Sequence, residues 1–388
     1  MSAPRVGIPG HHPLRYRRWL PLSVSLAALS LPVLPDGLGY DPWSWMIWGR
    51  EMDHGSLVTA GAASAFKPLP AFVDALMAPF GSAAGDLWLA CARAGVVISA
   101  VLVYHLAKAL GGRAAAVTAT AGWLSAKQVA GYLTLEGMSE PLCAAFVLLA
   151  VDAHLCRHRR LAVVLGAVAA LVRIELWPFV ACYAAVTFFT EPRRPKTVLV
   201  LVVAVLAVVP AAWFLPDAVS SGDLFRSVVR ATQESQGGPL LTSHPGLSTV
   251  AEGAGMFVWP LVALFVADTT ITVVTWVHND WVSGVNVQQL ATELPIAVSK
   301  LGGRHAAVTC GTIAAAPLQN PAVAWALDVT LGHVGISPSG HGVVFATDGQ
   351  PPVHTHGYRS VGTVGPPSAR WALLTTCGTT FAGAASGH

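Results

Sequence analysis

The stretch T-V-L-V-L-V-V-A-V-L-A-V-V-P-A-A-W-F-L, residues 197–215, contains no charged side chain. A helix needs about 20 mostly apolar residues to cross a bilayer, so this stretch predicts a membrane-spanning helix. The segment before it, Glu191-Pro-Arg-Arg-Pro-Lys196, carries three basic side chains. Basic residues beside a span mark its cytoplasmic end, so the helix is expected to run outward from the cytoplasm.

The composition of the whole chain agrees with a membrane protein. Hydrophobic residues make up 54% of the 388 residues and charged residues only 11%, whereas about a quarter of a soluble domain is charged. The net charge is +3, but the arginines form short clusters beside apolar runs. This pattern orients a membrane protein and argues against a nucleic-acid partner.

The remaining apolar runs predict seven or eight spans in total. Besides 197–215, the predicted spans are residues 19–38, 86–110, 114–132 and 138–156, two short helices within 161–190, and residues 251–266. A cleavable signal peptide competes for the first of these, but no small-residue cleavage site precedes Asp36, so a retained helix is favoured.

The basic clusters assign the two sides of the membrane. Residues 1–18, 108–113, 157–160 and 191–196 hold clustered basic side chains and are expected in the cytoplasm. The prediction is a cytoplasmic N-terminus (1–18) and a helical domain (19–267) with outer loops at 39–85 and 217–250. The protein is thus expected to be a multi-pass protein of the cell membrane.

The last part of the chain, 268–388, differs in composition and is expected to be soluble or loosely ordered. Short alternating stretches such as residues 342–347 predict a small mixed or β-rich tail, and the Pro/Gly-rich part from about residue 350 predicts little order. Its side of the membrane depends on whether 251–266 spans alone or returns with 271–277. Outside, Cys310 and Cys377 could pair as a disulfide; inside, they would be ordinary thiols. The fold class predicted is mainly α, a polytopic helical bundle with this tail.

The predicted topology collects ionisable side chains on the outer face. They are Asp41, Glu51, Asp53, Lys67, Glu136, Glu140, Arg173, Glu175, Asp217 and Asp223. Asp41 precedes Pro42 and suits a helix N-cap, or it could act as a base at the membrane surface. Lys67 could snorkel to head groups or bind a phosphate. Arg173 and Glu175 interrupt an apolar stretch, so they are expected to face a water-filled cavity or to form a structural ion pair.

Four motifs resemble actinobacterial multi-spanning proteins of the GT-C glycosyltransferase superfamily, over roughly residues 15–265. The motifs are Asp41-Pro-Trp-Ser-Trp-x-x-Trp-Gly-Arg-Glu51, Lys67-Pro-Leu-Pro70, Leu135-Glu-Gly-Met-Ser-Glu-Pro141 and Val172-Arg-Ile-Glu-Leu-Trp-Pro-Phe179. The chain departs from the superfamily in having fewer predicted spans after residue 266, as in a shortened or divergent copy.

The resemblance implies transfer of a sugar from a polyprenyl-phosphate carrier to a glycan or other hydroxyl acceptor outside the cytoplasm. It implies that Asp41 is the catalytic carboxylate, with Glu51 or Asp53 as substitutes. Lys67, Arg173, Glu175, Glu136 and Glu140 are then expected to bind substrate. A divalent cation is compatible with the superfamily, but the sequence predicts no metal ligands.

Two alternatives remain at the level of sequence. Ionisable residues within apolar helices are also typical of a secondary transporter or flippase, although no repeated halves are visible. A non-catalytic membrane scaffold is the other alternative, favoured by the shortened C-terminal half. The pair His354 and His356 in the Pro-rich tail predicts a solvated loop rather than a zinc site.

Overall fold

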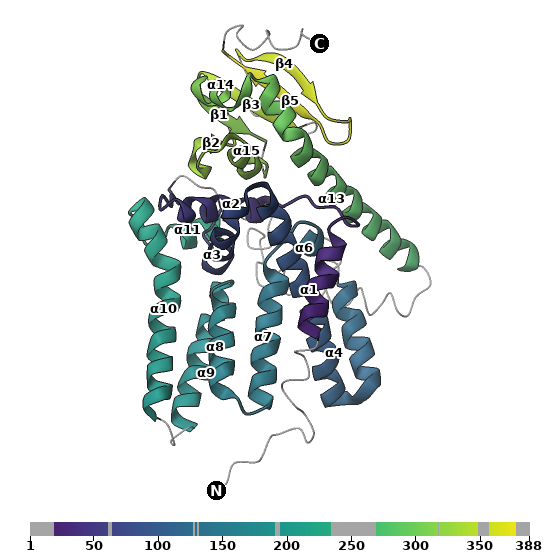
Figure 1. The fold of residues 1–388 in the computed structure, drawn as a ribbon, viewed down its shortest axis with the longest axis vertical. Coiled ribbons are helices and arrows are strands. Elements are labelled where there is room, and N and C mark those ends of the chain that lie inside the picture. Colours follow the sequence, from purple (N-terminus) through teal and green to yellow (C-terminus); the bar gives the residue numbers. More distant parts are fainter. Residues whose placement is uncertain are drawn as a thin grey trace, which may run out of the picture.

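The computed structural model describes residues 19–60, 64–126, 129, 132–190, 195–233, 269–316, 318–347 and 357–377. The protein is mainly helical with one small mixed sheet, as predicted for the fold class. Helices α4, α7, α8, α9 and α10 stand side by side, short helices lie across their upper ends, and the sheet lies beyond these (Figure 1). The predicted cytoplasmic segment 1–18, the apolar segment 251–266, and His354 and His356 lie outside the described residues.

The helices of the lower part follow the apolar runs of the sequence. They are α1 (Trp19–Ser30), α4 (Ala84–Ser125), α6 (Tyr132–Leu135), α7 (Glu140–Leu155), α8 (Arg159–Ala170), η3 (Ile174–Leu176), α9 (Trp177–Thr190) and α10 (Pro195–Ser221). α4 turns back on itself at Gly112, whose φ of 79° and ψ of −168° interrupt the helix. This turn separates the two spans predicted at 86–110 and 114–132.

The first helix is shorter than predicted. α1 ends at Ser30 after 12 residues, not near residue 38, and a helix of that length is about 18 Å long, compared with about 30 Å of hydrocarbon core. Arg93 of α4 explains where it ends, because its guanidinium donates to the Ser30 carbonyl at 3.1 Å and also to the Pro35 carbonyl. A buried cation that satisfies the last carbonyls stabilises a helix C-terminus.

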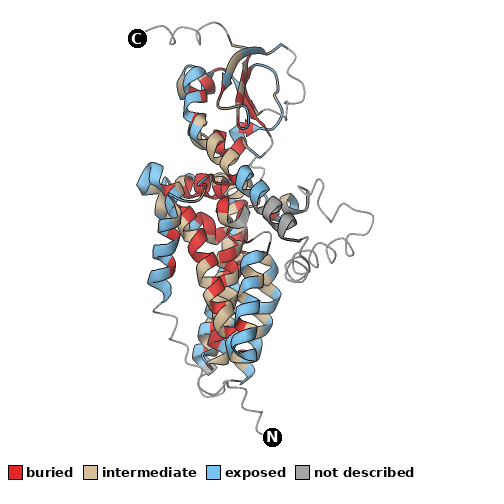
Figure 2. Cartoon of the chain, turned by 90° about the vertical axis from the view of Figure 1, so that its right-hand side faces the viewer, coloured by how far each residue is buried: buried red, intermediate tan, exposed pale blue. Residues whose placement is uncertain are grey.

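Two segments of the described chain are long and apolar enough to cross a membrane. They are Pro68–Ser125, which combines α3, η2 and α4, and Lys196–Ser221 in α10. Trp19–Ser30 and Ile174–Thr190 are shorter apolar helices. Exposed apolar side chains line α10 along much of its length, for example Val200, Val203 and Val208, and Figure 2 shows the outer helices largely exposed. These features support association with a membrane.

The short helices at the upper ends are α2 (Tyr40–Asp53), α3 (Pro68–Met77), η2 (Ala78–Ala83) and α11 (Arg226–Gln233). α2 is buried along most of its length, and its side chains Trp45, Ile47 and Trp48 are each 0% exposed. Figure 2 shows buried residues within this layer, whereas η2 has no buried residue. α2 therefore packs against both the upright helices and the C-terminal region.

The C-terminal region is more ordered than its composition predicted. It contains α13 (Thr269–Lys300), α14 (Gly303–Thr309), β1 (Thr312–Ala315), α15 (Asn320–Leu327), η5 (Leu331–His333), β2 (Val334–Gly335), β3 (Gly342–Thr347), β4 (Arg359–Val364) and β5 (Trp371–Thr375). The strand order is β2-β1-β3-β5-β4, with β1 parallel to its neighbours and β5 antiparallel to its own. The mixed tail is confirmed, but the prediction of little order from residue 350 is wrong for β4 and β5.

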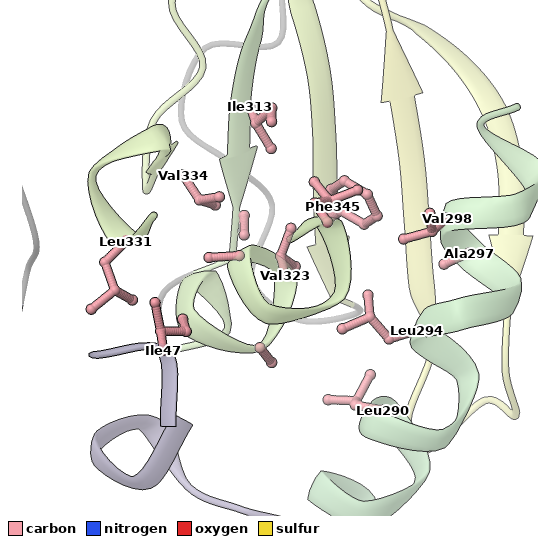
Figure 3. Close-up of a cluster of buried hydrophobic side chains, with 14 of the residues drawn as sticks. Ile47, Leu290, Leu294, Ala297, Val298, Ile313, Val323, Leu331, Val334 and Phe345 are labelled. Carbon is pink, nitrogen blue, oxygen red and sulfur yellow. The ribbon is translucent and has the colours of Figure 1, made fainter. Parts of the chain in front are cut away.

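One apolar cluster joins the sheet to α2. Figure 3 shows Ile47 of α2 beneath Leu331 and Val323, with Leu290 and Leu294 of α13 closing the other side. Full burial of a side chain such as Ile47 contributes about 1.5–3 kcal/mol. The sheet region is thereby fixed to the layer of short helices.

A polar contact reinforces this junction at Arg50 of α2. Its guanidinium lies 2.8 Å from Asp328 and 4.7 Å from the ring centroid of Trp325 in α15. The C-terminal region therefore lies at the same end of the upright helices as α2. The sequence had left that relation open.

Candidate functional site

Lys67 lies at the point where the chain enters α3. It precedes Pro68, and a residue before proline favours extended backbone, as the φ of −120° and ψ of 115° of Lys67 show. Pro68 occupies the first turn of the helix, where its missing N–H is not needed. The sequence Lys-Pro-Leu-Pro thus fixes the direction in which the lysine leaves the backbone.

The ammonium group of Lys67 contacts two carboxylates. Its Nζ lies 3.1 Å from Asp41 Oδ2 and 3.6 Å from Glu140 Oε1, and the side chain is only 12% exposed. It also lies 4.7 Å from the ring centroid of the buried Trp45. Snorkelling into solvent is therefore wrong as a description of Lys67, because carboxylates and an aromatic face surround its charge.

Asp41 lies in the first turn of α2 and is not its N-cap. The N-cap position is Gly39, and no side chain caps the helix there. The predicted capping role of Asp41 is wrong in this respect, although a carboxylate in a first turn still interacts favourably with the helix dipole. Its observed partner is Lys67.

Glu136 lies against the beginning of the same helix. The Gly39 N–H donates to the Glu136 carbonyl at 3.0 Å, and a Cβ on Gly39 would approach the Glu136 carboxylate oxygen Oε2 to 2.7 Å. A larger residue at position 39 would require the Glu136 side chain to shift. Glu136 is thus beside the entrance to α2.

Glu140 begins α7 and connects the lysine to Arg173. Its Oε1 accepts a hydrogen bond from Arg173 Nη1 at 3.0 Å. Arg173 precedes η3, and its Nε lies 3.6 Å from Glu175 Oε2. The expected ion pair of Arg173 with Glu175 is present, but the shorter contact of Arg173 is to Glu140, a partner that the sequence had not indicated.

Asp41, Lys67, Glu140, Arg173 and Glu175 thus form one continuous series of contacts, the ionic chain. Lys67 is its most buried member, and the exposed fraction rises from 12% for Lys67 through 24% for Glu140 and 42% for Arg173 to 66% for Glu175. Four elements far apart in sequence contribute to it, namely α2, α3, α7 and η3. An anion could approach Arg173 from solvent and reach Lys67 by displacing carboxylates.

Glu51 and Asp53 lie outside the ionic chain. They are at the C-terminal end of α2, ten or more residues from Asp41, which corresponds to about 15 Å along a helix. Glu51 is buried and accepts the Val58 N–H at 2.9 Å, and burial raises its pKa to about 7. Asp53 is exposed. The structure therefore separates these two substitutes from the group around Asp41.

The basic turns lie at the opposite ends of the helices. α7 runs from Glu140, beside Lys67, to Leu155, and the following turn carries Arg157 and the start of α8. Figure 1 shows this turn and the turn of α4 at the lower end, with α2 and α3 at the upper end. The predicted separation of basic turns from the acidic loops is therefore present in the fold.

Several charged groups of the described residues are buried although the sequence did not indicate it, among them Arg93, Asp217 and Arg226. Arg93 is 2% exposed and also donates to the Thr134 carbonyl; a single arginine within the apolar run 86–110 was its signal. Asp217 and Arg226, 0% and 7% exposed, form an ion pair at 3.6 Å. Asp217 was placed in an outer loop, yet it lies in the last turns of α10, and sequence gives no sign of its partner.

The ionic chain does not fit a divalent cation as it stands. The Lys67 ammonium occupies the space between Asp41 and Glu140, where a cation would have to bind. Within the described ranges, the one group of three ligand atoms close enough for a metal ion is Cys310, His341 and Cys377. The two cysteines of that group form a disulfide across 67 residues, so their sulfurs are already bonded to each other.

Comparison with known proteins gives no match to a protein-family model, to a curated protein sequence or to a solved structure.

Proposed function

We propose that the chain is a multi-pass membrane glycosyltransferase of the GT-C type. It would transfer a sugar from a polyprenyl phosphate to a glycan or other hydroxyl acceptor on the outer face of the membrane. The proposal combines the sequence resemblance with the ionic chain. The ionic chain is the observation that carries it, because it joins all four resembling motifs through direct contacts.

Membrane insertion is supported by charge as well as by hydropathy. The basic residues at the lower turns and the acidic residues at the upper end follow the positive-inside rule if the lower end is cytoplasmic. α2 would then lie at the level of the outer membrane surface. The sheet region would lie outside, where the Cys310–Cys377 disulfide is stable.

The donor phosphate would bind where the cations of the ionic chain are reachable. Arg173 offers a planar guanidinium that can hold two phosphate oxygens, and its exposure makes it the first contact. Lys67 offers a point charge further in. Each cation would leave its carboxylate partner and bind the phosphate. The negative charge of the phosphate would then take the place of a carboxylate charge beside that cation.

This exchange would prepare Asp41 for catalysis. Release of Lys67 to the phosphate removes the cation that holds Asp41 Oδ2, and a carboxylate without that partner is a stronger base. Asp41 would accept the proton of the acceptor hydroxyl as its oxygen attacks the anomeric carbon. The bond from that carbon to the phosphate oxygen breaks at the same time, and the polyprenyl phosphate leaves with the electron pair, which inverts the anomeric centre.

The direct test is turnover by the purified full chain in lipid nanodiscs. Polyprenyl-phosphate sugars are supplied with a mixture of glycan acceptors, and release of polyprenyl phosphate is measured by mass spectrometry. Acceptor-dependent release that is lost on Arg173→Gln together with Lys67→Gln supports the proposal. Absence of release with every donor, from a protein that is folded by its melting curve, would instead favour a scaffold.

A further inference from the structure

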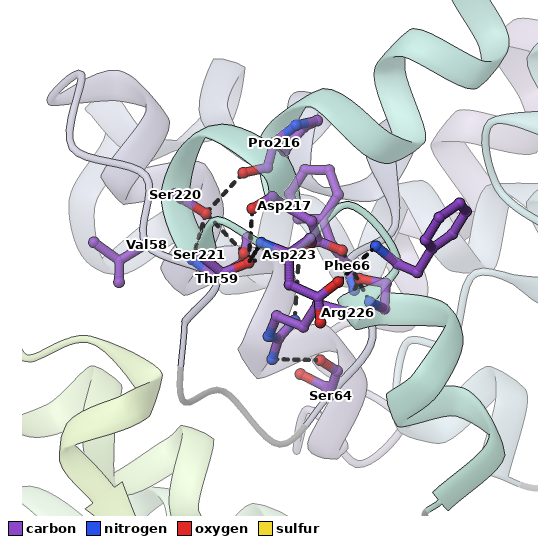
Figure 4. Close-up of polar contacts among 12 residues, drawn as sticks. Val58, Thr59, Ser64, Phe66, Pro216, Asp217, Ser220, Ser221, Asp223 and Arg226 are labelled. Carbon is purple, nitrogen blue, oxygen red and sulfur yellow. Dashed lines mark hydrogen bonds and ion pairs between the residues drawn. The ribbon is translucent and has the colours of Figure 1, made fainter.

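The loop that leads into Lys67 is held by a second part of the chain. Figure 4 shows the loop residues Thr59, Ser64 and Phe66 against the end of α10 and the start of α11. Three side chains of those helices contact the loop and a fourth, Asp217, contacts two of the three residues; we call these four residues the clamp. They are Asp217, Ser220, Arg226 and Ser227.

The first contact holds the loop on the side nearer α2. The Thr59 N–H donates to Ser220 Oγ at 3.1 Å, and the two hydroxyl oxygens lie 2.7 Å apart. Ser220 in turn donates to the Pro216 carbonyl at 2.7 Å. Because the Ser220 hydroxyl donates its hydrogen to the Pro216 carbonyl, its oxygen acts as the acceptor toward Thr59 of the loop.

The second contact lies immediately before Lys67. The Phe66 N–H donates to Ser227 Oγ at 3.0 Å in a fully buried position. Phe66 is 1% exposed and lies 5.2 Å from the Trp48 ring. The backbone one residue before Lys67 is thus fixed by a hydrogen bond on one side and by aromatic packing on the other.

Asp217 organises the clamp itself. Its Oδ2 accepts the Ser227 N–H at 3.0 Å, and its Oδ1 lies 3.6 Å from Arg226 Nη1. Arg226 Nη2 reaches the Ser64 carbonyl at 3.5 Å. Asp217, Arg226 and Ser227 are all buried, and buried charges are retained at a cost that their mutual pairing must offset.

From these contacts we infer that the clamp is a positioning element for the donor-binding lysine. It fixes the backbone from which Lys67 projects, so that the ammonium meets Asp41, Glu140 and the incoming phosphate at short range. The inference rests on the proposed function for the role of Lys67. The contacts of Ser220, Ser227 and Arg226 are to loop residues 59, 66 and 64, so the clamp acts on Lys67 through the loop.

The principal variant is Ser227→Ala, which removes the acceptor of the Phe66 N–H. Loss of a buried hydrogen-bond partner changes an equilibrium about 5- to 30-fold. The expected result is a donor KM raised by that factor with kcat changed less than twofold, because a displaced Lys67 weakens phosphate binding. Ser227→Thr keeps the hydroxyl and is expected to restore the donor KM.

The matched control is Ser221→Ala. The Ser221 hydroxyl bonds within its own turn, to the Asp217 carbonyl at 2.7 Å and from the Asp223 N–H at 3.2 Å. Ser221→Ala thus removes a serine hydroxyl from the neighbouring helix α10 and leaves the hydrogen bonds of the loop in place. The donor KM of this control is expected to stay within twofold of the wild type.

A second readout does not depend on turnover. Reductive methylation of lysines, followed by mass spectrometry, reports the accessibility of Lys67 relative to the exposed Lys196. Ser227→Ala is expected to increase methylation of Lys67 about 5- to 30-fold, and Ser221→Ala to leave it unchanged. This measurement tests the clamp even if no donor is turned over.

The outcomes separate the two proposals. Increased Lys67 methylation without any turnover in the wild type supports the clamp and contradicts the glycosyltransferase. Turnover with unchanged donor KM and unchanged Lys67 methylation in a folded Ser227→Ala protein overturns the clamp alone. A lower kcat at constant donor KM, with Lys67 methylation unchanged, also overturns it, since it indicates a smaller active fraction.

Discussion

Replacing Lys67 with methionine removes one charge from the centre of the ionic chain while keeping the length of the side chain. Asp41 and Glu140 would then lie close to each other without the cation that both contact, at 3.1 and 3.6 Å. Arg173 would remain as a cationic partner of Glu140 and Glu175 but makes no described contact with Asp41. The change therefore destabilises the folded protein through repulsion and through an unpaired carboxylate.

The size of the effect follows from burial. A charge pair about 4 Å apart interacts by about 4 kcal/mol at an effective dielectric constant of 20, before desolvation is subtracted. Exposed pairs contribute about 0–1 kcal/mol net, and breaking a fully buried pair costs about 3–5 kcal/mol. Lys67 is 12% exposed and its partners are 27% and 24% exposed, so Lys67→Met is expected to cost about 1–3 kcal/mol.

The assay is equilibrium unfolding in mixed micelles of a mild detergent and sodium dodecyl sulfate. Adding Glu140→Gln to Lys67→Met removes one of the two carboxylates and is expected to recover part of the loss. Lys196→Met, at an exposed position of α10, is the control and is expected to change stability by less than about 0.5 kcal/mol. Strictly additive effects of Lys67→Met and Glu140→Gln would refute the reasoning, because residues in contact must couple.

Three further predictions concern other parts of the chain. Because burial raises the pKa of Glu51 from 4.5 to about 7, the folded state binds this proton more tightly than the unfolded state. The unfolding free energy is therefore expected to fall as pH rises from about 4.5 to about 7. Glu51→Gln should remove about 1–3 kcal/mol of that fall. A difference in unfolding free energy between wild type and Glu51→Gln that does not change with pH would contradict this prediction. Cys310→Ala is expected to cost about 4 kcal/mol, since the disulfide closes a loop of 67 residues; non-reducing peptide mapping of protein from cells should find the linked peptide, and free thiols there would contradict an outer location. A Cys residue introduced as Arg159→Cys should resist an impermeant thiol reagent applied to intact cells, and strong labelling would reverse the proposed orientation.

The helices of the lower part could be predicted because hydropathy and basic clusters act over short distances in sequence. The α8–α9 hairpin with Arg173 near its turn was predicted from the apolar residues 161–190 and the basic clusters on both sides of them. The early end of α1 was not, because it depends on Arg93, which lies 63 residues from Ser30. Hydropathy measures whether a segment can span and does not report which partner ends it.

The C-terminal region was predicted less well for a different reason. α13 carries many polar residues, but Leu290, Leu294, Ala297 and Val298 recur at helical spacing and are buried against the sheet. In β5 the alternation of Trp371 and Leu373 with less buried neighbours was the available signal. Proline and glycine nearby obscured both patterns.

The residues of the ionic chain were all among the predicted site residues, but their contacts were not predicted, and the predicted residues Glu51, Asp53 and Glu136 are not part of the ionic chain. Four charged residues of the ionic chain were singled out as ionisable groups in apolar surroundings or resembling motifs, and Glu140 was included among the outer acids. That Lys67 lies between Asp41 and Glu140 requires α2, α3 and α7 to meet, which no local pattern specifies. The same holds for the ion pair of Asp217 with Arg226.

The central claim is that Asp41 is the base of a sugar transfer from polyprenyl phosphate, and its most direct test is the single-turnover rate of Asp41→Asn. The variant keeps the shape of the side chain and removes the ionised carboxylate; Asp86→Asn, at an exposed position of α4, is the control for loss of an outer carboxylate. General-base assistance contributes about 10²- to 10⁴-fold, so a folded Asp41→Asn protein is expected to transfer sugar that much more slowly while Asp86→Asn stays near the wild-type rate. A folded Asp41→Asn protein that transfers sugar at the wild-type rate would contradict the mechanism.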